Sequence, residues 1–259
     1  MRNMLVKSVA AVLAMAAAGA ANAAIDTPHL GGNGELFLTI WDPTVGNEAS
    51  FNIGLNLNIN SFTGNSGFVL SNVFSDSTFQ QYFGAGSAGG SNLGNTAAWR
   101  YNVVAASNSA DQSGLLFTQV GGGFSGLLNG ATDNAANATD LYQVALGSCD
   151  SCGTDVKASP KYAGDNWGNN FAGAAAVINN AAGVGGTLNF YRAVNNTAPD
   201  YINDASSPAT LTQLGTWVLS SAGNGTLTYS PVPLPAAAWL LGSGLIGLFG
   251  IGRRREQAV

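Results

Sequence analysis

Apolar residues occupy every second position between residues 51 and 60, and this alternation restricts that stretch to β-structure. Side chains of a strand point alternately to its two faces, whereas helical neighbours recur every three or four residues. The pattern therefore predicts an antiparallel sheet with one face on the core and one solvated, asparagine-bearing face. The apolar positions are Phe51, Ile53, Leu55, Leu57 and Ile59, and the opposite ones are Asn52, Asn56, Asn58 and Asn60.

Similar but shorter patterns predict further strands at residues 35–41, 68–74, 97–105, 115–120, 187–194, 215–219 and 226–229. Asn224-Gly225 lies between the last two and favours a type I′ hairpin turn. Residues 140–146 and 171–182 have helical spacing or are rich in alanine, so short helices are expected there. The predicted fold is one mainly β domain, an antiparallel two-sheet sandwich.

The C-terminal end has the features of a membrane-spanning segment. An apolar run at 236–252 follows Pro233 and Pro235 and precedes Arg253, Arg254 and Arg255. Its 17 residues would reach ~26 Å as a helix, slightly less than a hydrocarbon core of ~30 Å. The arginines would keep that end and the tail at 256–259 in the cytoplasm, so the preceding domain would lie outside.

The N-terminal end agrees with this topology. Arg2 and Lys7 precede an apolar run at 9–20, and Ala21 and Ala23 are small residues of the kind that signal peptidase requires. We predict a signal peptide at 1–23 that is cleaved after Ala23. The exported domain then spans residues 24–230, and a sorting segment spans residues 231–255.

This tail resembles the sorting signal of the PEP-CTERM proteins of Gram-negative bacteria, in its VPLPA variant. The matching residues are Val232, Pro233, Leu234, Pro235 and Ala236, with the apolar run and the arginines behind them. The resemblance implies processing by a membrane-embedded exosortase, an inner-membrane intermediate, and a final place at the cell surface or outside the cell. It also implies an association with exopolysaccharide and biofilm. The alternative from hydropathy alone is a permanent single-span anchor.

The charge of the exported region argues against nucleic acid as a partner. Between residues 24 and 231 there are four basic residues and 13 of the 14 acidic ones, a formal net charge of −9. An acidic, sparsely charged surface repels phosphate groups.

Two cysteines and one histidine limit the possible chemistry. Cys149 and Cys152 would form a small disulfide loop after export; a redox dithiol is the alternative, but no thioredoxin-like context surrounds it. His29, close to the predicted mature N-terminus, is a poor position for a general base. We expect no catalytic residue, no resident metal and no cofactor.

Two polar clusters are candidate binding sites. Trp167 follows Asp165 and Asn166, and an indole beside amide and carboxylate groups can stack on a sugar; packing of Trp167 over the sheet edge is the alternative. Asp133 and Asp140 are candidate Ca²⁺ ligands, although their spacing does not fit an EF-hand and a solvated turn is the alternative.

The leading functional hypothesis is therefore a non-enzymatic cell-surface or extracellular-matrix protein that is processed through its tail. A lectin-like carbohydrate-binding module is the first alternative. A secreted polysaccharide-active hydrolase is the second, since a glycosidase needs only two carboxylates and the chain has many aspartates in predicted turns.

Overall fold

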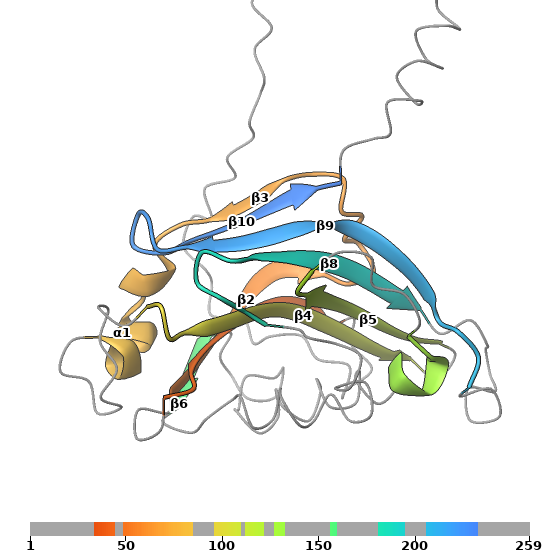
Figure 1. Cartoon of the computed structure of the whole chain (residues 1–259), viewed down its shortest axis with the longest axis horizontal. Coiled ribbons are helices and arrows are strands. Elements are labelled where there is room, and N and C mark those ends of the chain that lie inside the picture. Colours follow the sequence, from red (N-terminus) through yellow and green to blue (C-terminus); the bar gives the residue numbers. More distant parts are fainter. Residues whose placement is uncertain are drawn as a thin grey trace, which may run out of the picture.

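The computed structural model describes residues 34–44, 49–84, 96–109, 112–121, 127–132, 156–159, 181–194 and 206–232, which are mostly strands (Figure 1). The named helices are a 3-10 helix η2 (Val73–Ser75) and an α-helix α1 (Ser77–Phe83), and residues 129–132 form one further helical turn. The strands are β1 (Glu35–Asp42), β2 (Ala49–Asn58), β3 (Phe68–Leu70), β4 (Arg100–Ser109), β5 (Gln112–Gln119), β6 (Val156–Ser159), β7 (Ala182–Gly183), β8 (Thr187–Val194), β9 (Thr210–Ser220) and β10 (Thr226–Pro231).

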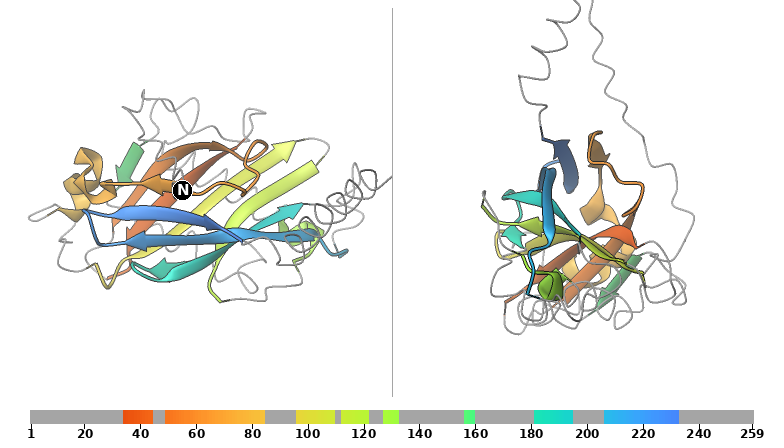
Figure 2. Two further views of the ribbon diagram at one scale, coloured as in Figure 1. Left: turned by 90° about the horizontal axis from the view of Figure 1, so that it is seen from above. Right: turned by 90° about the vertical axis from the view of Figure 1, so that its right-hand side faces the viewer.

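These strands form one antiparallel sheet, which confirms the predicted mainly β class. The order is β3-β10-β9-β8-β5-β4-β1-β2-β6, with β7 paired to β4. Instead of two separate sheets, one sheet curls so that β9 and β10 cross over β1 and β2 (Figure 2). Wide sheets twist and curl because each strand has a right-handed twist.

The strand boundaries agree with the sequence pattern where apolar alternation is long. Strand β8 has the predicted bounds, and β9 begins five residues before the predicted position 215. The strand expected at 68–74 ends at Leu70, because Asn72 takes a left-handed conformation (φ 62°) and η2 follows. Helix α1 was not expected; Asp76 begins it by accepting hydrogen bonds from the amides of Thr78 (2.8 Å) and Phe79 (3.1 Å).

The alternation in β2 is confirmed, although the strand contains an irregularity. Glu35 pairs with Asn58 and Phe37 with Gly54, so β2 has two more residues than β1 in this interval. Asn56 takes a left-handed φ of 54° there, and its amide donates to the Glu35 carboxylate. Because side chains alternate between the two faces of a strand, two extra residues leave the later side chains on their original faces. A single extra residue would have moved them to the opposite faces. The predicted apolar residues therefore all belong to the core or pack against it.

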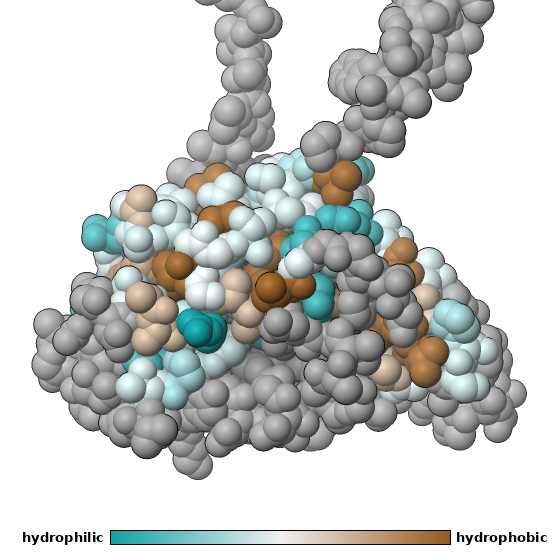
Figure 3. All heavy atoms as spheres, viewed as in Figure 1, coloured by the Kyte–Doolittle hydropathy of each residue, from teal (hydrophilic) through white to brown (hydrophobic). Residues whose placement is uncertain are grey.

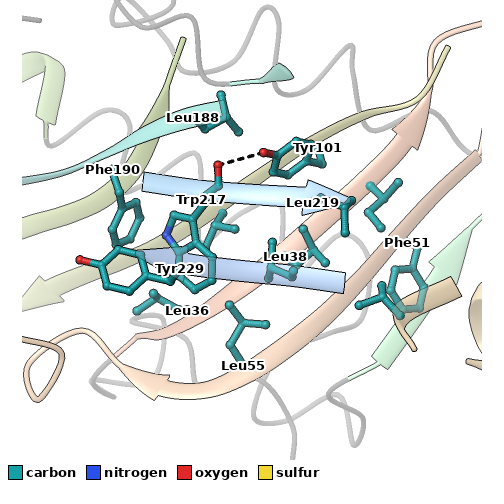
Figure 4. Close-up of a cluster of buried hydrophobic side chains, with 14 of the residues drawn as sticks. Leu36, Leu38, Phe51, Leu55, Tyr101, Leu188, Phe190, Trp217, Leu219 and Tyr229 are labelled. Atoms are coloured by element: carbon teal, nitrogen blue, oxygen red, sulfur yellow. Dashed lines mark hydrogen bonds between the residues drawn. The ribbon is translucent and has the colours of Figure 1, made fainter. Parts of the chain in front are cut away.

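The inner face of the curled sheet holds one aromatic core. Leu36 and Leu38 of β1 and Leu55 of β2 lie behind Trp217 of β9 and Tyr229 of β10 (Figure 4). At one end of the sheet, Phe74, Phe79 and Phe83 make ring contacts with Trp99, with centroids 5.1–5.4 Å apart. Helix α1 thus covers the end of the core with its aromatic residues.

The connection from β2 to β3 joins the two arms of the sheet. Phe62 packs edge-on against Phe190 (5.8 Å) and Tyr229 (5.3 Å). The Arg192 guanidinium donates to the carbonyls of Ile59 (2.8 Å) and Phe62, and burial lowers its pKa. The Tyr229 hydroxyl lies 3.0 Å from the Gly64 carbonyl, to which it donates. Side chains of β8 and β10 therefore hold a segment that starts at the opposite arm.

We predict that Gly225→Ala lowers the free energy of unfolding by about 2–4 kcal/mol, through backbone strain and overpacking. Gly225 lies in the β9–β10 connection with φ +85°, and an added Cβ would lie 2.7 Å from the Phe74 ring. Gly121 is the control, because it has φ +80° but nothing within 4 Å of an added Cβ. Gly121→Ala should cost about 1 kcal/mol. Chemical denaturation measures both losses, and equal values would contradict the role of the Phe74 ring.

We predict that stability falls at alkaline pH because of buried tyrosines. Burial raises the pKa of Tyr229 to about 12 and also raises the pKa of Tyr101, whose hydroxyl donates to the Trp217 carbonyl (3.1 Å). The unfolded chain loses its phenol protons near pH ~10. The free energy of unfolding should therefore be constant below pH ~10 and fall as the pH rises toward 12.

The fall should be shallower in Tyr229→Phe and shallower still when Tyr101→Phe is added. Denaturant titrations between pH 8 and pH 12 measure this slope. An unchanged slope in the double variant would show that other groups cause the alkaline loss.

Candidate functional site

Most site residues predicted from the sequence lie outside the described residues. Val232 is described; it follows β10 and is 45% exposed. No helix in the part of the chain that the structure describes is long and apolar enough to cross a membrane, and residues 236–252 lie outside that part. Also outside it are Ala21, Ala23, His29, Asp133, Asp140, Cys149, Cys152, Asp165, Asn166, Trp167, Pro233, Leu234, Pro235, Ala236, Arg253, Arg254 and Arg255.

The carboxylates within the described ranges bond the backbone. Asp42 accepts from the Thr44 amide (2.9 Å), Asp76 begins helix α1, and Glu35 accepts from the Asn56 amide. Among the same residues, no group of three or more His, Cys, Asp or Glu side chains is close enough to hold a metal. These three acids therefore have structural roles at a turn, a helix start and a strand irregularity.

The outer face of the sheet carries an arrangement that the sequence did not reveal. Thr39 of β1 pairs with Asn52 on one side and Asn102 on the other. In the other arm, Asn189 of β8 pairs with Gln119 of β5 and with Thr216 of β9. Extending the β4–β5 register by two residues from the pair Val104–Phe117 places Gln119 beside Asn102. The result is a polar row across seven strands: Asn52, Thr39, Asn102, Gln119, Asn189, Thr216 and Ser230.

One end of the polar row is buried, and this corrects the expectation of a wet asparagine face. Asn52 and Thr39 are fully buried, Asn102 is 1% exposed and Gln119 is 8% exposed. Asn56 and Asn60 are exposed as expected, while Asn58 is half-buried. Asn52 differs because it lies in the regular part of β2, paired with Thr39 of β1 and Lys157 of β6, whereas Asn56 and Asn60 lie at the irregular end of β2 and in the turn after it.

Several groups in the buried end have no hydrogen-bond partner. They are the Thr39 hydroxyl, both amide atoms of Asn102 and the Gln119 carbonyl oxygen. Gln119 uses its Nε2 to donate to the Val120 carbonyl (3.3 Å). An unmet buried polar group costs about 1–3 kcal/mol, so several within one row are unfavourable for folding alone.

The other end of the polar row reaches the surface. Asn189 and Thr216 are half-buried and Ser230 is exposed. Gln213 is exposed beside them, and its Nε2 donates to Asn189 Oδ1 (3.0 Å). The Asn189 amide in turn donates to the Gly121 carbonyl. The orientation of Asn189 is therefore fixed by bonds on both its oxygen and its nitrogen.

Aromatic side chains flank the polar row. The neighbouring row of paired residues contains Phe37, Val104, Phe117 and Tyr191. The rings of Phe117 and Tyr191 are stacked, with centroids 5.8 Å apart and an interplanar angle of 24°. Sequence reasoning missed this arrangement because its members come from strands far apart in the chain. The only local signal was a polar residue between two apolar ones in β1, β2, β4 and β8.

We predict that Asn102→Leu stabilises the protein by about 1–2 kcal/mol, because it removes two unmet polar atoms while keeping a similar shape. Thr118→Val is the control, since the Thr118 hydroxyl accepts from the Val103 amide (3.3 Å). That substitution should destabilise by about 1 kcal/mol. Denaturant unfolding measures both changes. A loss of stability in Asn102→Leu would show that the amide has a stabilising partner.

Comparisons of the chain with protein-family models, with curated proteins and with solved structures found no match in any of the three. Its function therefore has to be inferred from its own residues and their arrangement.

Proposed function

We propose that this chain is an exported, non-enzymatic cell-surface or extracellular-matrix protein whose C-terminal tail is processed by an exosortase. The observation that carries the proposal is the ordered tail: Val232-Pro233-Leu234-Pro235-Ala236, the apolar run 236–252, and the arginines 253–255. The signal peptide expected at 1–23 gives the same topology. Before processing, the tail would hold the protein in the inner membrane.

The boundary between the folded domain and the tail supports this proposal. Strand β10 ends at Pro231, and the Val232 amide still donates to the Leu214 carbonyl (2.9 Å). Pro233 has no amide hydrogen, so strand pairing cannot continue regularly through it. The folded sheet thus ends one residue before the prolines of the motif. A processing enzyme could engage the motif without unfolding the sheet.

The architecture suits a binding or matrix role. Both arms of the curled sheet supply the single core, as the two layers of a sandwich do, and we propose that the exported domain acts as such a sandwich. In the view of Figure 3, the described surface is mostly pale with separate hydrophobic patches, as expected for a protein exposed to water.

A carbohydrate-binding module is the second candidate function. The observation that favours it is the polar row, because amides and hydroxyls are groups that bind sugars. The two candidates are compatible, since a matrix protein can be held in place by the polysaccharide that it binds.

Processing can be tested in a bacterial host that has an exosortase. We expect the wild-type chain to lose its tail and appear at the surface or in the medium. A Pro233→Ala/Pro235→Ala variant should keep full length and accumulate in the inner membrane. Immunoblots of cell fractions, with mass spectrometry of the C-terminus, measure this difference.

Pro231→Ala is the matched control, because this proline precedes the motif and belongs to β10. It should be processed like the wild type. Identical size and location of the wild type and the double variant, with and without the exosortase, would contradict the proposal and favour a permanent anchor.

A further inference from the structure

We propose that the exposed end of the polar row binds an uncharged polysaccharide chain, which would lie across strands β8, β9 and β10. Asn189, Thr216 and Ser230 would bond its hydroxyl groups. This proposal adds a ligand and a site to the proposed function. It rests on the proposed function in one respect, namely that export brings the protein to the place where it would meet the polysaccharide.

The absence of charge on this part of the outer face selects a neutral ligand. Within the described parts of β8, β9 and β10, every side chain that points away from the core is uncharged. An anionic or cationic polymer would find no opposite charge there. The outward side chains are Thr187, Asn189, Tyr191, Ala193, Leu211, Gln213, Thr216, Val218, Ser220, Thr226, Thr228 and Ser230.

The hydrogen-bonding groups of the polar row match those of sugars. A sugar hydroxyl both donates and accepts, and so do the hydroxyls of Thr216 and Ser230. The Asn189 amide is already oriented by Gln213 and the Gly121 carbonyl. An oriented amide loses less conformational entropy on binding than a free one.

An independent observation comes from the adjoining, buried end of the row. The Gln119 carbonyl oxygen lies one strand away from Asn189, is nine-tenths buried and has no hydrogen-bond partner. Both amide atoms of Asn102 are in the same state. These groups cost stability without a partner, and the one nearest to the exposed end of the row is the Gln119 oxygen.

The spacing of the row also fits a polymer. Neighbouring strands lie about 4.8 Å apart, so polar groups repeat at that interval along a line perpendicular to the strands. A sugar ring in an extended polysaccharide has a comparable length, so successive sugars can meet successive strands. The stacked pair Phe117 and Tyr191 borders the row on one side, where both rings are buried.

Binding can be measured with the full chain, purified in a mild detergent, by isothermal titration calorimetry. Dextran, laminarin and xyloglucan are the neutral probes, and alginate is the anionic one. Thr216→Val removes one hydroxyl from the row and keeps the β-branched shape. Thr228→Val is the matched control, because Thr228 lies on the same face and pairs with Val218 in the adjacent row.

We expect saturable binding of at least one neutral polysaccharide and no binding of alginate. Thr216→Val should weaken binding about fivefold, the loss of one net hydrogen bond, and Thr228→Val should leave it within about twofold. Adding Ser230→Ala to Thr216→Val should weaken it further. Circular dichroism and thermal melting would show that each variant is folded.

Three results would overturn the proposal: no binding of any neutral probe by the wild type, preferential binding of alginate, or equal losses in Thr216→Val and Thr228→Val. The binding measurement uses purified protein, so a negative binding result would be independent of whether the protein is exported. A failure of tail processing in the fractionation experiment would, conversely, leave a measured affinity unaffected.

Discussion

The structure depends on the connection between β2 and β3, which brings the two arms of one sheet together. Strand β2 lies near one edge of the sheet, whereas β3 pairs with β10 at the other, so the chain must cross between them. Phe62 fills the crossing against Phe190 and Tyr229, and Arg192 bonds the carbonyls of Ile59 and Phe62. Burying a charged guanidinium is costly unless its donors are hydrogen-bonded, and these carbonyls accept from one of its terminal nitrogens, while Nε has no partner. The crossing therefore holds the two arms of the curled sheet together around the aromatic core.

The two faces of the curled sheet have different physical roles. The inner face holds the aromatic core from β1, β2, β8, β9 and β10, and its packing supplies most of the apolar burial. The outer face carries polar groups in register across the strands, and at the buried end some of them have no partner. A sheet selected for stability alone would have apolar residues at those positions. Unmet groups also occur on the inner face, at the indole nitrogens of Trp99 and Trp217, so the proposed ligand site is carried by the exposed end of the row.

The proposed export and processing are compatible with the observed end of β10. Within the described residues the last backbone bond of β10 is made by Val232, and Pro233 has no amide hydrogen with which to continue the pairing. Protein and polysaccharide would meet outside the cell, where the proposed polar-row site would hold a processed protein in the matrix. Export, processing and binding would then depend on separate parts of the chain.

The sequence by itself determined the strand character of the chain, and its two ends carry the proposed topology. Alternation at a period of two is a local pattern, so β2 and β8 were predictable from their own residues. Even the irregularity at Asn56 left the apolar side chains of β2 on the same face. Helix α1 was missed because its short sequence has little helical preference, and its aromatic residues are held mainly by contacts with Trp99. Only the tertiary structure decided that one sheet curls in place of two stacking, and which polar residues share a row. Strand order and register depend on contacts between residues far apart in the chain, and a local pattern contains no information about them.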